Sequence, residues 1–395
     1  MANNERWLLP EGIEEILPAQ AERLETLRRQ LLDTYHSWGY ELVMPPQFEY
    51  LESLLTGTGN DLGLQTLKVT DQLTGRLMGL RADMTPQVAR IDAHHLGRQG
   101  PSRLCYMGTV MKALPEGAAG SRSPLQVGAE LYGHSGPESD AEVIQLMLAT
   151  LQICGVQQTH IDLGHVGIYR GLVKQAGLSA EQESVLFDAL QRKAKPEIRE
   201  LLAQMDLDLD AGLGDMLNSL ADLNGGAGVL DEAATILANA NDEVQQALQT
   251  LARVAELLQS ANSSISVHYD LAELRGYHYH TGIVFAAYVS GQSQAVAQGG
   301  RYDDIGKVFG RARAATGFST DLKTLVNLQG WTESQVDAIL APHDSDPVLQ
   351  SRITELRNTG ERVIQALPGQ TGDVAEMGCR RTLIKQAGDW VVQSL

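Results

Sequence analysis

Short strand-like segments separated by glycine-containing turns are the feature that most limits how this chain can fold. Three of them follow one another, at residues 67–81 (LKVTDQLTGRLMGLR), 102–112 (SRLCYMGTVMK) and 125–133 (LQVGAELYG). Short strands joined in this way pair as antiparallel hairpins. Helical patterns lie between and beside the strands, so we predict an α+β fold in which an antiparallel sheet is flanked by helices.

The helical patterns have recognisable beginnings and ends. Residues 18–38 repeat leucine at helical spacing, and Gly39 follows as a stop signal. Residues 85–96 (TPQVARIDAHHL) predict a helix with Thr85 as its N-cap and Pro86 as its first helical residue. A further helix is expected over residues 139–155, ending at Gly155.

The chain changes character twice beyond residue 170. Strand signals disappear from about 172 to 262, where leucine and alanine recur at helical spacing. Residues 329–395 alternate short strand and helix patterns, which is typical of a small α/β unit. We therefore expect two domains, residues 1–328, interrupted by a helical insertion, and residues 329–395.

Charge and cysteine content limit the partners and the compartment. The 395 residues include 49 acidic and 31 basic side chains, a net charge of −18, which disfavours a grip on a nucleic acid backbone without excluding a local basic patch. Cys105, Cys154 and Cys379 lack metal-ligand spacing and indicate free thiols. No apolar stretch is long enough to span a bilayer, so we expect a cytoplasmic protein. We also expect neither a metal nor a cofactor.

The richest local pattern is ELRGYHYHTGIVFAA at 273–287, followed by AQGGRYDDI at 297–305. The first predicts a strand whose inner edge carries Arg275, Tyr279 and His280. The second predicts a tight Gly299-Gly300 turn that lets backbone approach closely and presents Arg301 and Tyr302. A cation, phenols and an imidazole suit a small amino-acid-like ligand, although a tyrosine-rich strand packed in a core explains the pattern equally well.

Together with YMGTVMK, LQVGAELYG and LRADMTPQ, in the same order and at similar spacing, these segments resemble the class II histidyl-tRNA synthetase family over roughly residues 8–328. The resemblance implies a class II synthetase-like antiparallel sheet with a helical insertion. It also implies that residues 329–395 are a shortened version of the anticodon-binding domain.

The resemblance further implies a histidine pocket. The corresponding residues are Asp83, Thr85, Gln126, Glu130, Arg275, Tyr279, His280 and Tyr302. Asp83 and Thr85 match the amine-binding positions, Glu130 the residue that faces the imidazole, and Arg275 the histidine-specific arginine. His280 replaces the second tyrosine of the family's Tyr-Tyr pair. Each residue also has a structural alternative, such as a helix cap for Thr85 or a packed strand residue for His280.

The positions that handle ATP in the synthetases have changed. The resemblance places Lys112 where the family holds the α-phosphate with arginine, and lysine lacks the two-pronged fork of a guanidinium. Lys323 and Thr324 fall where the third motif has a Glu-Arg pair. A phosphate clamp built on charge does not survive these changes without compensation. The expected result is a chain that does not adenylate histidine.

These departures resemble the histidyl-tRNA synthetase paralogues that serve as regulatory subunits of ATP phosphoribosyltransferase. That resemblance implies a non-catalytic subunit that activates a short-form catalytic partner, binds L-histidine as feedback effector and forms a homodimer within a hetero-octamer, with no tRNA and no membrane as partners. The alternative is an active histidyl-tRNA synthetase or another histidine-adenylating ligase. A weaker third interpretation is a histidine-binding protein with a different partner.

Overall fold

A computed structural model describes residues 7–56, 60–115, 120–156, 158–207, 212–263, 265–277, 279–328, 337–370, 374 and 376–395. The chain divides into two compact units, residues 1–330 and 331–395, and each is described by itself. The domain boundary expected after residue 328 adjoins residues 329–336, which lie outside the described residues.

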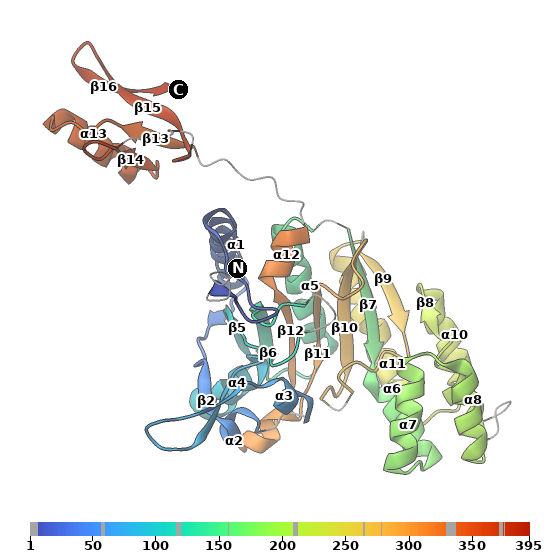
Figure 1. Ribbon diagram of the computed structural model, residues 1–395. Helices are drawn as coiled ribbons and strands as arrows, with labels where there is room; N and C mark the ends of the chain where they lie inside the picture. The colour runs from blue at the N-terminus through green and yellow to red at the C-terminus, as the bar shows by residue number, and fades with distance from the viewer. Residues whose placement is uncertain are drawn as a thin grey trace. The chain divides into compact units, whose positions relative to one another are not determined.

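A nine-stranded sheet forms the centre of the N-terminal unit (Figure 1). Its strands, in spatial order, are β1 (Glu41–Leu42), β5 (Ser102–Thr109), β6 (Leu125–Tyr132), β12 (Ala315–Asp321), β11 (Ala297–Arg301), β10 (Ile283–Val289), β7 (Thr159–His165), β9 (Ser266–Asp270) and β8 (Asn224–Gly225). From β5 to β7 every neighbouring pair is antiparallel. The predicted α+β class, with an antiparallel sheet flanked by helices, is therefore confirmed for the centre of the molecule.

The two ends of this sheet depart from the prediction. Strand β1 pairs with β5, and β7 pairs with β9, in parallel. Parallel neighbours need a long crossover connection. The crossover from β7 to β9 is the whole helical segment between them, so the sheet is mixed where a distant part of the chain supplies the next strand.

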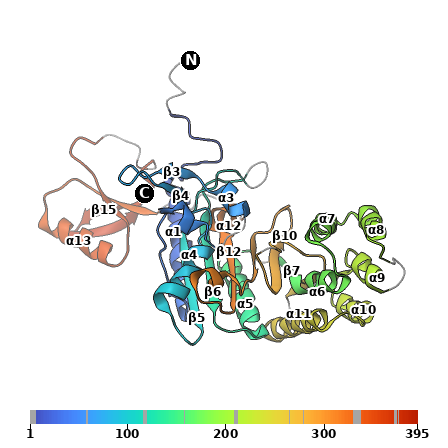
Figure 2. The ribbon, with the colours of Figure 1, turned by 90° about the horizontal axis from the view of Figure 1, so that it is seen from below.

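Long helices cover the sheet. Helix α1 (Pro18–Ser37) buries Leu24, Leu27 and Leu31, as the leucine spacing predicts. Helix α5 (Pro137–Ile153) contacts both β12 and helix α11 (Asp242–Ala261), and Figure 2 shows these two helices next to each other. No helix in the described ranges combines the length and the apolar character needed to cross a lipid bilayer.

A smaller sheet and short helices lie between β1 and β5 along the chain. The sheet has the order β2 (Phe48–Tyr50), β4 (Leu77–Leu80), β3 (Lys68–Thr70), and the hairpin of β3 and β4 matches the pattern at 67–81. The short helices between β1 and β5 are α2 (Leu51–Leu54), α3 (Asn60–Gln65) and α4 (Thr85–Arg90), and α4 continues into the π-helical turn η2 (Ile91–Leu96). Later in the chain, the 3-10 turn η3 (Ile305–Phe309) follows β11, and helix α12 (Leu322–Leu328) follows β12.

The expected helical insertion lies between β7 and β9. Its helices are α6 (Val166–Ala176), α7 (Ala180–Gln191), α8 (Lys195–Gln204), α9 (Gly212–Ser219), α10 (Gly228–Ile236) and α11. The insertion begins a few residues earlier than the pattern suggests, directly at the end of β7. A short strand, β8, pairs with β9 in a stretch where the sequence shows no strand signal.

Two local predictions near the ligand motif are wrong. Turns lie at residues 275–277 and 279, and strand β10 begins only at Ile283, because Gly276 adopts a φ of +65° and the amides of Tyr279 and His280 both donate to its carbonyl. Gly299 and Gly300 lie inside strand β11 and not in a tight turn. Their lack of a side chain leaves room for neighbouring backbone, since a Cβ on Gly299 would lie 2.1 Å from the carbonyl oxygen of Gly317 on β12.

The C-terminal unit is a small α/β structure. Its sheet has the order β14 (Val363–Gln365), β13 (Ala338–Ala341), β15 (Cys379–Gln386), β16 (Asp389–Ser394), and its helix is α13 (Pro347–Asn358). The side chain of Asp346 caps α13 by accepting from the amide of Val348. Apolar residues from both layers, including Ile339, Leu349 and Trp390, form its core.

Candidate functional site

A cavity of about 200 Å³ opens at the centre of the main sheet. The residues expected to bind histidine that line it are Asp83, Thr85, Glu130, Arg275, Tyr279, His280 and Tyr302. Gln126 is not in its lining, but its side chain donates to Asp83 over 2.6 Å. The structure thus brings together residues that lie up to about two hundred positions apart in the sequence.

The floor of the cavity is a row of paired residues across neighbouring strands. Glu130 on β6 pairs with Gly317 on β12, which pairs with Gly300 on β11. A Cβ on Gly317 would lie 1.5 Å from Oε2 of Glu130. The Glu130 side chain therefore lies against the backbone of β12 only because residue 317 has no side chain.

Glu130 is buried among hydroxyl groups. Thr85 Oγ1 and the Tyr106 hydroxyl donate to Oε1 over 3.0 and 2.9 Å, and the Tyr302 hydroxyl donates to Oε2. Burial raises the pKa of Glu130 to about 8, an effect to which the nearby Asp83 adds, although the hydroxyl groups oppose it. This carboxyl group is thus poised near neutral pH to donate a proton to, or accept one from, a polar ring.

Thr85 does not cap its helix. Met84 is the N-cap residue, and α4 begins at Thr85 with Pro86 second. The Thr85 hydroxyl lies between the Tyr106 hydroxyl and Glu130, at 3.0 Å from each. The N-cap prediction is wrong by one residue, because a Thr-Pro pair marks a helix start without fixing which residue caps it.

Asp83 is held as a ready acceptor at the edge of the cavity. Its Oδ1 accepts from the amide of Thr85 over 3.1 Å and from the Gln126 side chain. Gln126 in turn accepts from the amide of Met84 over 3.0 Å, which fixes its own orientation. A carboxylate fixed in this way suits an ammonium group.

The segment that carries Arg275, Tyr279 and His280 is held by the helical insertion. Arg170 of α6 donates to the carbonyl oxygens of Tyr277 and His280, both over 3.1 Å. The Tyr277 hydroxyl donates to Glu183 of α7 over 2.6 Å. The insertion, which looks remote from the ligand motif in the sequence, therefore positions one wall of the cavity.

Arg275 is engaged by two neighbours that the sequence analysis did not single out. Its Nη2 donates to Oε2 of Glu273 and to the hydroxyl of Tyr288, each over 2.7 Å. The other oxygen of Glu273 accepts from the amide of Arg275 over 2.8 Å. Glu273 also lines the cavity, and its position two residues before Arg275 was a usable signal.

Tyr279 and Tyr302 form an aromatic wall. Their rings stack with centroids 5.0 Å apart and planes at 22°. The Tyr279 hydroxyl is buried and, among the described residues, has no hydrogen-bond partner. A buried hydroxyl without a partner carries a free-energy cost that a bound polar group removes.

His280 lies flat over backbone. A Cβ on Gly276 or Gly300 would meet its ring within 2.8 Å. Burial lowers its pKa to about 4, so the ring is neutral at pH 7. Its Nδ1 lies 3.3 Å from the Arg301 carbonyl oxygen, and because a carbonyl only accepts, Nδ1 carries the proton and Nε2 is an acceptor.

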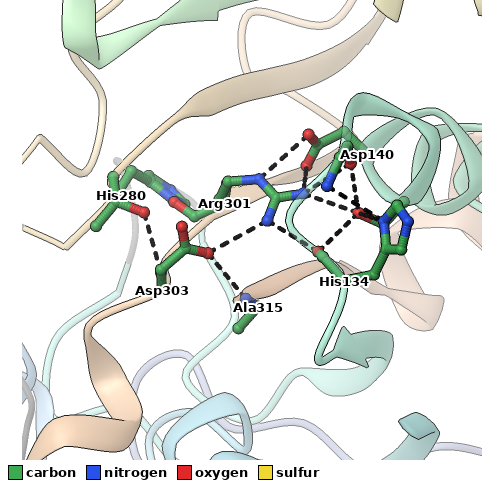
Figure 3. A network of polar contacts seen from close by, with 9 residues as sticks. His134, Asp140, His280, Arg301, Asp303 and Ala315 are labelled. Carbon is green, nitrogen blue, oxygen red and sulfur yellow. Dashed lines mark hydrogen bonds and ion pairs between the residues drawn. The ribbon is translucent and has the colours of Figure 1, made fainter. Parts of the chain in front are cut away.

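Arg301, expected to face the ligand, instead enters a buried network behind the wall (Figure 3). Its guanidinium pairs with Asp140 at 3.0 Å and donates to Ser139 and to the carbonyl oxygen of His134. Asp303 accepts from the same guanidinium and from the amide of Ala315. Arg301 thus joins strands β11 and β12 to the start of α5.

A larger cavity of about 730 Å³ adjoins the first and shares Asp83, Arg275, Gln298 and Ser319 with it. Lys112 and Thr324 line this second cavity. The Thr324 hydroxyl donates to Asp321 over 2.9 Å. Lys323 is absent from the lining, since its Nζ lies 3.3 Å from Ser123 Oγ and 3.3 Å from a carboxylate oxygen of Glu14.

Comparisons with known proteins give consistent results. Residues 12–325 match the family described as Histidyl-tRNA synthetase, and residues 336–393 match the ATP phosphoribosyltransferase subunit HisZ C-terminal domain. ATP phosphoribosyltransferase regulatory subunits from Thioalkalivibrio sulfidiphilus and Ectopseudomonas mendocina are 62% and 57% identical, each over the full length of both chains.

Solved structures agree. A Bacillus halodurans protein described as an ATP phosphoribosyltransferase regulatory subunit/histidyl-tRNA synthetase superposes with a TM-score of 0.84 at 28% identity, covering 95% of this chain and 97% of that one. Histidyl-tRNA synthetase from Nostoc sp. PCC 7120 superposes with a TM-score of 0.78 at 17% identity, covering 98% and 97%. The second match concerns the fold alone, and the expected class II synthetase-like architecture is confirmed.

Replacing Gly317 with alanine should destabilise the protein by roughly 1–3 kcal/mol, because the new Cβ forces the Glu130 carboxyl group out of its place. Urea denaturation measures this change. Gly226→Ala is the matched control, since its Cβ would meet nothing within 4 Å. Equal losses in the two variants would contradict the proposed contact between residue 317 and Glu130.

The pKa of Glu130 predicts a pH-dependent stability. The folded-state pKa of about 8 exceeds the ordinary value of 4.5, so the folded protein keeps a proton that the unfolded chain releases. Its stability contribution is complete below pH 4.5 and is lost as pH rises toward 8. The free energy of unfolding of the wild type relative to Glu130→Gln should fall by up to about 1.4 kcal/mol per pH unit in this window. If the difference between the unfolding free energies of the two proteins stays constant from pH 5 to pH 8, the raised pKa of Glu130 is refuted.

Proposed function

The chain belongs to the family of ATP phosphoribosyltransferase regulatory subunits, and from this premise we propose that it binds L-histidine in the smaller cavity and transmits the feedback signal to a catalytic partner. The single observation that carries the proposal is the buried Tyr279 hydroxyl, which has no hydrogen-bond partner in the described part of the chain and lines the same small cavity as Glu130. A bound polar ring would give the Tyr279 hydroxyl the hydrogen-bond partner that it lacks among the described residues.

Each end of histidine has a complementary group in the cavity. The Asp83 carboxylate, fixed by Gln126, suits the ammonium group. The guanidinium of Arg275 suits the carboxylate, and Glu130 with Tyr279 suits the two nitrogens of the imidazole. His280 presents its acceptor nitrogen as a neutral ring, in the position where the synthetases have a tyrosine.

We also propose that the subunit does not adenylate histidine. Neither Thr324 nor Lys323 has a guanidinium to hold a phosphate. The Thr324 hydroxyl donates to Asp321, and Nζ of Lys323 contacts Ser123 and Glu14. Arg122, the arginine in the loop between β5 and β6, donates to the carbonyl oxygens of Lys112 and Glu11. The match to the synthetase family and the open larger cavity favour histidine adenylation as the second candidate function.

The proposed partner is a short-form catalytic ATP phosphoribosyltransferase subunit, with this chain as a homodimer within a hetero-octamer. The net charge of −18 supports the absence of tRNA from the complex. The buried free thiols of Cys105, Cys154 and Cys379 support a reducing compartment, and we place the complex in the cytoplasm.

Reconstitution tests the proposed function directly. Mixed with the catalytic subunit, the chain should raise the rate of phosphoribosyl-ATP formation, and L-histidine should lower it. Asp83→Asn removes a charge but keeps the acceptor oxygen. Half-inhibition, measured against each protein's own uninhibited rate, should need about 10- to 150-fold more histidine in this variant than in the wild type. Asp231→Asn, an exposed acid on α10, serves as the control. An inhibition curve that is identical in both variants would place the inhibitory site elsewhere.

Pyrophosphate exchange separates the two candidate functions. With ATP, L-histidine and labelled pyrophosphate, the purified chain should give no exchange above a protein-free control, because Lys112, Lys323 and Thr324 replace the charged residues that the synthetases resembling it use to hold the phosphates. Histidine-dependent exchange above that control would establish adenylation and reject the non-catalytic assignment.

A further inference from the structure

We propose that Glu273 is a specificity-determining residue. Its carboxylate partly neutralises the guanidinium of Arg275 and so weakens the preference of the cavity for histidine over histamine, the amine that has no carboxylate. The inference rests on the proposed function, because it takes Arg275 as the group that meets the carboxylate of histidine. It assigns a role to a residue that the resemblance to synthetases did not mark.

The geometry makes Glu273 an internal competitor for the guanidinium. Oε2 of Glu273 accepts from Nη2 of Arg275 over 2.7 Å, and the Tyr288 hydroxyl occupies the same nitrogen. Glu273 is itself well buried, with 14% of its side chain exposed, and lines the cavity beside Arg275. A ligand carboxylate that approaches Arg275 therefore meets a second negative charge at close range.

The charge balance of the lining points the same way. The carboxyl and guanidinium side chains that line the smaller cavity are Asp83, Glu130, Glu273 and Arg275, and the ring of His280 in the same lining is neutral at pH 7. Besides Glu130, whose pKa burial raises to about 8, two carboxyl groups, Asp83 and Glu273, lie in the lining with a single guanidinium. Such a cavity attracts the ammonium of the ligand more strongly than its carboxylate.

Glu273 has a second, local role that the experiment must keep. Its Oε1 accepts from the backbone amide of Arg275 over 2.8 Å, which helps to shape the turn. Glutamine keeps an oxygen acceptor of the same length and removes only the charge. Glu273→Gln is therefore the informative variant, and Glu273→Ala is not.

The test compares L-histidine with histamine, which lacks the carboxylate, by titration calorimetry on the full-length chain at pH 7.5. Removing the charge should favour the carboxylate of histidine, whereas any loss of attraction for the ammonium acts on both ligands. The ratio of the histamine to the histidine dissociation constant should therefore rise at least about 3- to 10-fold in Glu273→Gln, since like charges about 4 Å apart repel at this level even when water screens them fully.

The matched control is Glu256→Gln, which removes the carboxylate of an exposed pair with Arg253 on α11 and should leave the ratio at its wild-type value. A purely structural effect at residue 273 changes both affinities alike, so an unchanged ratio would overturn the role of Glu273 while leaving histidine binding intact. Failure of the wild-type chain to bind histidine would instead overturn the proposed function, and this inference with it.

Discussion

The cavity depends on one contact, in which the carboxyl group of Glu130 lies against the backbone of a glycine on the neighbouring strand. A side chain at residue 317 would occupy the same space as the carboxyl oxygen. Hydroxyl groups from α4, β5 and the segment after β11 then hold that carboxyl group in place. The floor of the cavity is therefore a property of the sheet itself, and the other walls are arranged around it.

The remaining walls come from parts of the chain that fold for different reasons. The start of α4 supplies Asp83 and Thr85, whereas the segment with Arg275 and Tyr279 is shaped by Gly276 and held by the insertion. Behind that segment, the buried pair of Arg301 and Asp140 fixes strand β11 to α5. Because these supports are independent, the affinity for a ligand that touches all the walls depends on the relative positions of the sheet, the insertion and α4.

The sequence alone was sufficient for the fold class and for seven of the residues that line the cavity, although it missed Glu273 and placed Gln126 in the lining, because strand and helix periods are local and the resemblance ordered the motifs. It was insufficient where distant contacts decide. The segment before β10 looked like a strand, since Tyr277 and Tyr279 suit strands, yet Gly276 and Arg170 favour the turns at residues 275–277 and 279. Arg301 looked like a ligand group because nothing local indicates its partner Asp140 on a helix far away in the sequence.

The hold of the insertion on the ligand segment has an evolutionary consequence. Arg170 grips the segment through the carbonyl oxygens of Tyr277 and His280, which every amino acid possesses. Hydrogen bonds to backbone carbonyl oxygens do not depend on which side chains the segment has. Lineages that inherit it are free to exchange the ring at residue 280, and with it the chemistry offered to a ligand, while the course of the backbone is preserved.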